Sequence, residues 1–181
     1  MSFSTMIAVL GLAQADALPA CPDYFPREDF FDCSVDLGEG ERLDVLGEQA
    51  VRTAIHVRGS GESRPLEFPE EQSEFNGVRR VDLNLDGTEE VLLSLFYGIP
   101  NGNEIIYQRG ADGWLEVAGV TDGLGVSPAS EPGGLLDNWA RVGGGYLRQA
   151  FLTLDESGLR RVYELGFNYP LIRCDFEHGP A

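Results

Sequence analysis

The sequence has few stretches in which apolar residues recur every three to four positions, the spacing of an amphipathic helix. Its 181 residues include 23 Gly and 10 Pro. These counts exceed ordinary usage, and both residue types end helices and form turns. Short runs of strand character alternate with the turn signals. We therefore expect an all-β fold: a single compact domain of antiparallel sheets, arranged as a sandwich or a twisted meander.

The expected strands are short and are separated by turns. They cover residues 42–46, 50–57, 78–82, 91–97, 103–109, 114–118, 138–142, 146–155 and 159–167. The run 91–97 is almost continuously apolar, as expected of a strand that is buried on both faces. The segments 59–75 and 123–137 are predicted to be connections. Residues 21–34 are predicted to form an irregular segment whose core anchors are Phe25, Phe30 and Phe31.

Basic residues are scarce. There are 13 of them against 30 acidic residues, which gives a formal net charge of −17. Such a surface repels the phosphates of nucleic acids and of anionic lipids, so we expect no nucleic-acid partner and no binding to an anionic membrane surface. A basic protein is the complementary partner. No apolar run is long enough for a membrane-spanning helix.

Histidine is scarcer still, with only His56 and His178 in the chain. The sequence also lacks a Gly-x-Ser-x-Gly elbow, a Cys–His arrangement for nucleophilic catalysis and a phosphate-binding loop. Carboxylates are abundant, but an ordinary acidic surface explains them better than a glycosidase pair does. We therefore expect a binding protein and not an enzyme.

The start of the chain indicates export. Residues 6–13 form a short apolar run, and Ala15, Asp16 and Ala17 follow with a small-x-small cleavage pattern. This predicts a signal peptide over residues 1–17 and one β domain over 18–181, although residues 1–5 lack the usual basic group. Residues 18–21 also resemble a lipobox, so the alternative is a lipoprotein signal over 1–20 with a lipid anchor on Cys21. Both readings place the protein in the periplasm or cell envelope.

Cysteine is limited to three residues, Cys21, Cys33 and Cys174, which allow one disulfide and one odd thiol. If Cys21 carries a lipid, Cys33 and Cys174 remain to pair. That bridge would tie the two ends of the domain together and stabilise it by about 3–5 kcal/mol. The alternative is the local bridge between Cys21 and Cys33. No close Cys or His pair has the spacing of a zinc site.

The most informative segment is residues 82–90, Asp-Leu-Asn-Leu-Asp-Gly-Thr-Glu-Glu, because oxygen-bearing side chains recur at every second position. Ca²⁺ takes about six to eight oxygen ligands, and Gly87 permits the sharp turn that directs them inward. Leu83 and Leu85 are expected to face a core. The predicted calcium ligands are the side chains of Asp82, Asn84, Asp86 and Glu90 and the backbone carbonyl of Thr88.

An EF-hand would need Glu at the twelfth position, where this chain has Leu93, and a helix where it has strand character. The segment instead resembles the D-x-[DN]-x-D-G-x-x-[DE] loop set between strands in integrin-type FG-GAP repeats. The alternative is an Asp-Gly hairpin turn without a metal. No second complete loop of this kind occurs, so a multi-bladed propeller is not expected.

The order of the features resembles the periplasmic inhibitors of invertebrate-type lysozyme and related immunity proteins, over residues 40–167. That resemblance implies an exported calcium-binding protein that inhibits a basic peptidoglycan hydrolase by inserting loops into its cleft. Those inhibitors use a Ser-Gly-x-x-Tyr loop, and Val142 replaces the Ser here. The implied partner-binding residues are Gly143, Gly144, Gly145 and Tyr146. Two alternatives stay open: a glycine-rich turn with Tyr146 in the core, and a calcium-stabilised adhesion or scaffold module without inhibitory activity.

Overall fold

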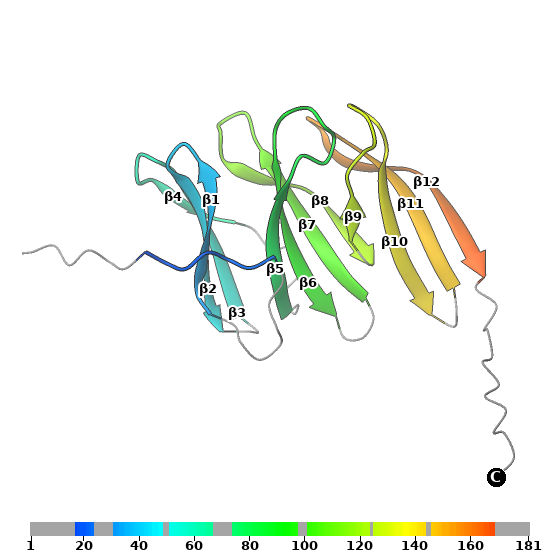
Figure 1. Cartoon of the computed structure of the whole chain (residues 1–181), viewed down its shortest axis with the longest axis horizontal. Coiled ribbons are helices and arrows are strands. Elements are labelled where there is room, and N and C mark those ends of the chain that lie inside the picture. The colour runs from blue at the N-terminus through cyan, green and yellow to red at the C-terminus, as the bar shows by residue number, and fades with distance from the viewer. Residues whose placement is uncertain are drawn as a thin grey trace, which may run out of the picture.

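A computed structural model describes residues 17–23, 31–48, 51–66, 74–97, 101–123, 125–143 and 146–168. These residues form twelve strands and no helix, so the all-β prediction is confirmed. The strands make three antiparallel sheets of four (Figure 1). None of the described residues belongs to a helix that is long and apolar enough to cross a bilayer.

Each sheet is a meander of strands that are consecutive in the sequence. The first sheet contains β1 (Cys33–Gly38), β2 (Glu41–Glu48), β3 (Val51–Val57) and β4 (Ser63–Pro65). The middle sheet contains β5 (Glu74–Val81), β6 (Glu90–Tyr97), β7 (Asn101–Arg109) and β8 (Leu115–Gly123). The last sheet contains β9 (Val126–Ser127), β10 (Leu136–Gly143), β11 (Tyr146–Asp155) and β12 (Gly158–Asn168).

The nine predicted strands all correspond to observed strands. Strand β1 begins within the segment 21–34 that was predicted to be irregular, and β4 and β9 lie in the predicted connections 59–75 and 123–137. A four-stranded meander is also the form of a propeller blade. Here the three sheets stand in a row, with the middle sheet between the other two (Figure 1).

Two hydrophobic cores hold the row together. The first lies between the first and middle sheets and the second between the middle and last sheets. Strand β6 supplies both cores, because Val91 and Leu93 point into the first and Leu92 into the second. This alternation explains why the run 91–97 is almost continuously apolar. Burying each such side chain stabilises the fold by about 1.5–3 kcal/mol.

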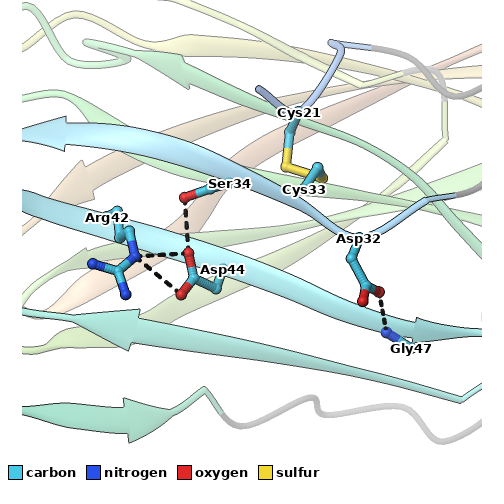
Figure 2. Close-up of a disulfide and its surroundings, with 7 residues drawn as sticks. All are labelled: Cys21, Asp32, Cys33, Ser34, Arg42, Asp44 and Gly47. Carbon is cyan, nitrogen blue, oxygen red and sulfur yellow. Dashed lines mark hydrogen bonds and ion pairs between the residues drawn. A yellow bond between two sulfur atoms is a disulfide. The ribbon is translucent and has the colours of Figure 1, made fainter. Parts of the chain in front are cut away.

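A disulfide joins Cys21 to Cys33 (Figure 2). The preceding segment runs beside β1, where Cys21 N–H donates to the carbonyl of Ser34 at 3.0 Å and Ser34 N–H donates to that of Pro19 at 2.8 Å. This pairing brings the two cysteines together. The predicted bridge between Cys33 and Cys174 is therefore wrong in this structure.

The same bond bears on two other predictions about the N-terminal segment. The sulfur of Cys21 is taken up by the disulfide, so it is not free to carry the predicted lipid. Phe31 is 42% exposed and is not the core anchor that was expected. Phe25, Phe30 and Cys174 lie outside the described residues, as do the first 16 residues of the predicted signal peptide 1–17.

Candidate functional site

The oxygen-rich loop, residues 82–90, connects β5 to β6. Val81 and Glu90 pair across the two strands and close the base of the loop. The backbone within it is tightly curled: Leu85 and Gly87 both have positive φ, at 58° and 93°. Gly87 adopts this conformation without steric cost because it has no Cβ.

The aspartates of the loop accept hydrogen bonds from its own amides. Asp82 accepts from the backbone N–H of Asp86 at 3.1 Å and from that of Gly87 at 2.9 Å. Asp86 accepts from the N–H of Thr88 at 2.8 Å. Burial by itself would raise the pKa of Asp86, but the bonds from Thr88 and Asn84 outweigh it and hold that pKa below its usual value.

Asn84 lies at the centre of the loop and is buried. Its Oδ1 accepts from the N–H of Asp86 at 3.1 Å, and its Nδ2 donates to Oδ2 of Asp86 at 2.9 Å. Asn84 Nδ2 also lies 3.5 Å from the carbonyl oxygen of Leu154 in β11. Asn84 therefore connects Asp86 within the loop to Leu154 of the last sheet.

Glu90 is the most buried carboxylate of the loop, with 3% of its surface exposed. It accepts a hydrogen bond from the backbone N–H of Leu83 at 2.8 Å. Burial raises the pKa of Glu90, and the negative charges of Asp86 and Asp82 raise it further. The loop thus places two acidic groups, Asp82 and Asp86, beside one buried carboxylate.

The two leucines of the loop differ in burial. Leu83 is fully buried in the second core, as predicted. Leu85 is 37% exposed, so the prediction that it faces a core is wrong. Its left-handed backbone conformation accounts for the difference, because it breaks the alternation of an extended chain and turns the side chain outward.

The loop also docks on the last sheet, which the sequence did not predict. The carbonyl of Leu83 accepts from the N–H of Ala129 at 2.8 Å, and that of Asn84 accepts from the N–H of Gly133 at 2.9 Å. Both donors lie in the connection between β9 and β10. The oxygen-rich loop is consequently a polar link between the middle and last sheets, beside the second core.

The predicted calcium ligands are of the type that Ca²⁺ prefers, namely carboxylate, amide and carbonyl oxygens. Among the described residues, no three His, Cys, Asp or Glu side chains already converge as a metal-ligand set. The predicted set also depends on Asn84 and on the carbonyl of Thr88. Each carboxylate oxygen that accepts one N–H keeps a second lone pair, so the observed hydrogen bonds are compatible with a cation.

The predicted partner-binding residues lie at the connection between β10 and β11. Gly143 ends β10 and pairs with Tyr146, which begins β11; Gly144 and Gly145 lie outside the described residues. Tyr146 is 42% exposed, so it is not the core residue of the alternative interpretation. Its ring lies over Gly166 of β12, where an added Cβ would come within 2.9 Å of the ring.

A second surface was missed by the sequence analysis. On the outer face of the last sheet, the cross-strand pairs Leu147–Phe167 and Phe151–Tyr163 place apolar side chains side by side, and Leu165 lies opposite Gln149. The rings of Phe151 and Tyr163 stack with centroids 4.3 Å apart, and those of Trp139 and Phe167 at 5.8 Å. We call this surface the aromatic face; it consists of Trp139, Leu147, Phe151, Tyr163, Leu165 and Phe167.

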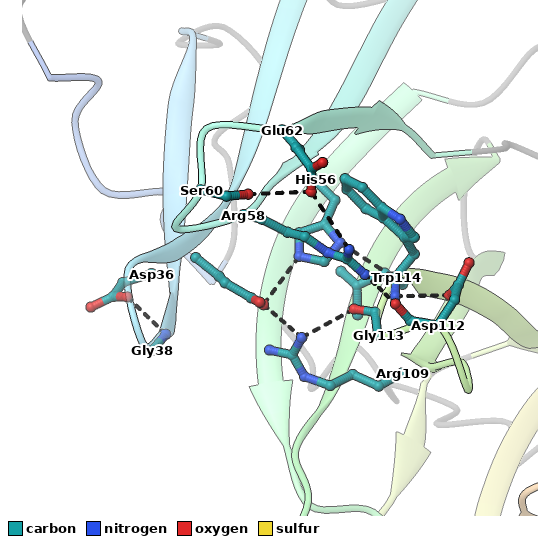
Figure 3. A network of polar contacts seen from close by, with 12 residues as sticks. Asp36, Gly38, His56, Arg58, Ser60, Glu62, Arg109, Asp112, Gly113 and Trp114 are labelled. Carbon is teal, nitrogen blue, oxygen red and sulfur yellow. Dashed lines mark hydrogen bonds and ion pairs between the residues drawn. The ribbon is translucent and has the colours of Figure 1, made fainter.

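His56 belongs to a polar network between the first and middle sheets (Figure 3). Its Nδ1 accepts from the N–H of Leu115 at 3.2 Å, and its Nε2 lies 3.3 Å from Glu41, to which Arg109 also donates at 2.6 Å. Burial lowers the pKa of His56. Burial would raise the pKa of Glu41, but the bonds from Arg109 and His56 lower it.

Trp114 completes the network. Its ring meets that of His56 edge to face with centroids 5.1 Å apart, and the guanidinium of Arg58 lies 3.9 Å from a Trp114 ring centroid. His56 has no exposed surface. Its contacts link two sheets and leave it no route to solvent. His178 lies outside the described residues.

Comparisons of the chain with protein-family models, curated proteins and solved structures find no match.

Proposed function

We propose that this chain is an exported calcium-binding protein that inhibits, or gives immunity against, a peptidoglycan hydrolase in the bacterial cell envelope. One observation carries the proposal. A half-exposed Tyr146 stands at the end of the β10–β11 hairpin, in the sheet on which the oxygen-rich loop docks. The hairpin supplies the contact, and the loop holds the sheet that presents it.

The hairpin suits insertion into a cleft. Tyr146 offers a large amphipathic ring at a low cost in side-chain entropy, and its packing over Gly166 restricts the ring before any partner arrives. Val142, before the glycines, is also exposed. A hydrolase cleft that receives these side chains would be closed to its polysaccharide substrate.

The proposed calcium site is the oxygen-rich loop, held by Asp82, Asn84, Asp86, the carbonyl of Thr88 and Glu90. A bound Ca²⁺ would supply positive charge among three carboxylates that otherwise repel one another. Because Asn84 and Leu83 also bond to the last sheet, neutralising the loop would strengthen the link between the middle and last sheets. Calcium therefore has a stabilising role in this proposal and no chemical one.

The net charge supports a basic target. A chain with a formal charge of −17 attracts a cationic hydrolase over distances of about a Debye length, about 8 Å at physiological salt, and speeds their encounter. Tightness would come from the hairpin, since exposed charges change association rates more than they change affinity. The inhibition should accordingly weaken only modestly with added salt.

The test is an inhibition assay of the full chain against a panel of lysozyme-type and other peptidoglycan hydrolases. We expect one class to be inhibited at stoichiometric concentrations and Tyr146→Ala to raise the inhibition constant at least about tenfold, as for an interface anchor. Val120→Ala, at an exposed apolar residue of β8, is the control and should inhibit like the native chain. Full hydrolase activity throughout the panel, at excess protein, would contradict the proposal. Binding without inhibition would favour the adhesion or scaffold role.

A further inference from the structure

The two ends of the row of sheets differ in their outer faces. On the first sheet, Ser34 donates to Asp44 at 2.8 Å and Arg42 donates to the same carboxylate at 3.0 Å, so this outer face is polar (Figure 2). On the last sheet, Trp139 of β10 and apolar side chains of β11 and β12 form the aromatic face, beside the hydrogen-bonded pair of Gln149 and Asp137. In a stack of similar units, a polar outer face caps an end, whereas an apolar one leaves it open to a further unit.

We propose that the aromatic face binds the same face of a second copy, giving a two-fold dimer in which six sheets stand in one row. The contact would repeat the sheet-on-sheet packing by which the middle sheet already contacts both neighbours. A two-fold axis makes such an interface self-complementary. This dimer does not depend on hydrolase inhibition, because the hairpin and the aromatic face are separate contacts.

The stacked rings favour a protein sheet over a sugar as the occupant. Phe151 and Tyr163 are inclined by 20° and Trp139 and Phe167 by 24°, so each ring already covers one face of its neighbour. A sugar ring binds flat against a free aromatic face. Ring edges separated by Leu147 and Leu165 instead form ridges and grooves that interdigitate with another sheet.

The low net charge of the last sheet favours a second copy of the chain, and not a basic protein, as the partner of the aromatic face. Residues 125–168 contain five acidic residues and four arginines, a net charge of −1, whereas the whole chain carries −17. The excess acid therefore lies outside the last sheet and its connections. Sheets pack about 10 Å apart and the Debye length is about 8 Å, so two copies that meet through their last sheets keep most of their charge beyond effective repulsion.

The area of the aromatic face determines how tight a dimer we expect. Strands β10, β11 and β12 have 8, 10 and 11 residues. At about 3.3 Å per residue and about 4.8 Å between strands, two such faces bury on the order of 1,000 Å² in total. This is the lower end of specific interfaces, so we expect a dimer that dissociates on dilution in the micromolar range.

The test is analytical ultracentrifugation of the full chain over a range of concentrations. We expect the mass to double as concentration rises, and Leu165→Arg to raise the dissociation constant more than about tenfold by placing a charge in the interface. Val120→Arg is the matched control, because Val120 and Leu165 are exposed by 40% and 44% on different sheets; it should dimerise like the native chain. Equal melting temperatures of the two variants exclude a folding defect.

Three outcomes would overturn the dimer. One is a native chain that stays monomeric at every concentration. Another is a dimer that Leu165→Arg leaves unchanged, which would place the contact elsewhere. The third is a monomer in which Leu165→Arg alone lowers the melting temperature, which would show that the face is covered within one chain. None of these results alters the expected inhibition by the hairpin, so the two proposals can fail separately.

Discussion

Two carboxylate networks, one on each side of the middle sheet, differ in their electrostatics. On the side of the first sheet, the partly buried carboxylate of Glu41 meets Arg109 and His56, so this network contains its own cation, the guanidinium of Arg109. On the side of the last sheet, Arg79 pairs with Glu104 and also donates to the carbonyl of Val126. The oxygen-rich loop on that side is different, because Asp82, Asp86 and Glu90 are bonded to neutral N–H groups. The ion pairs found among the described residues involve other carboxylates.

This difference indicates which of the two networks gains from a cation in solution. A carboxylate network that includes its own cations is complete when the chain folds, whereas one without them gains from an external cation. We therefore expect the link to the last sheet to respond to calcium and the link to the first sheet to respond to pH. Three sets of stability measurements test the contributions of these two interfaces.

Calcium should give the largest effect. At a free concentration 100-fold above its dissociation constant, it should stabilise the protein by about 2.7 kcal/mol, measured by urea denaturation with and without a chelator. Asp86→Ala should remove the response. Asp36→Ala is the matched control, because Asp36 accepts from the N–H of Gly38 at 2.9 Å in the same local geometry as Asp86 and Thr88. Identical unfolding curves with calcium and with chelator would contradict a stabilising site.

The pH response of the other interface should be smaller. The folded pKa of His56 lies below its usual 6.5, so below that pH the unfolded chain binds more protons than the folded one. Stability should be complete above pH 6.5 and should fall as pH drops from there through the folded pKa, by at most about 1.4 kcal/mol per pH unit. Urea denaturation at several pH values measures this slope.

The matched variant for that experiment is His56→Gln, which cannot titrate. It should be less stable at pH 7, because burial suits the imidazole that Leu115 and Glu41 contact, but its stability should change less between pH 7 and pH 5.5. An equal slope in both proteins would assign the pH response to other groups. Glu41 also has a lowered pKa, and its contribution should be lost at lower pH.

Arg58→Ala should give the smallest effect. Its guanidinium stacks on the exposed side of the same interface, against Trp114, and also contacts the carbonyl of Asp112. A cation–π contact at a partly exposed site is worth about 0.5–1 kcal/mol. Arg64→Ala, which removes an exposed ion pair with Asp112, is the control and should cost less. If both variants lose the same amount of folding stability, the contact between Arg58 and Trp114 does not stabilise the protein measurably.

The sequence predicts those parts of the molecule that depend on near neighbours. The alternation of β6 between two cores and the gathering of Asp82, Asn84 and Asp86 in one loop both follow from spacing. Contacts between segments that are distant in the sequence cannot be predicted from spacing. Asn84 and Leu154 are 70 positions apart, and only the packing of the last sheet brings them together.

Three predictions failed, each for a different structural reason. Leu85 was assigned to a core because strand alternation was extended through a loop, where a left-handed residue reverses it. The aromatic face was overlooked because residues 159–167 are apolar on more than one side, and the side that faces a partner sheet depends on the curvature and order of all three sheets. The bridge between Cys33 and Cys174 was preferred over the alternative that the structure has, because the parallel pairing of Ala20 with Ser34 has no local sequence signal.

The sequential meanders also bear on how the protein folds. Each sheet is built from strands that adjoin in the chain, so most pairings close short loops and contact order is low for an all-β protein. Among the described residues, most buried apolar side chains of the outer sheets belong to the two cores that each outer sheet shares with the middle one. We expect the middle sheet to belong to the folding nucleus, with the first and last sheets able to open one at a time as separate units of hydrogen exchange.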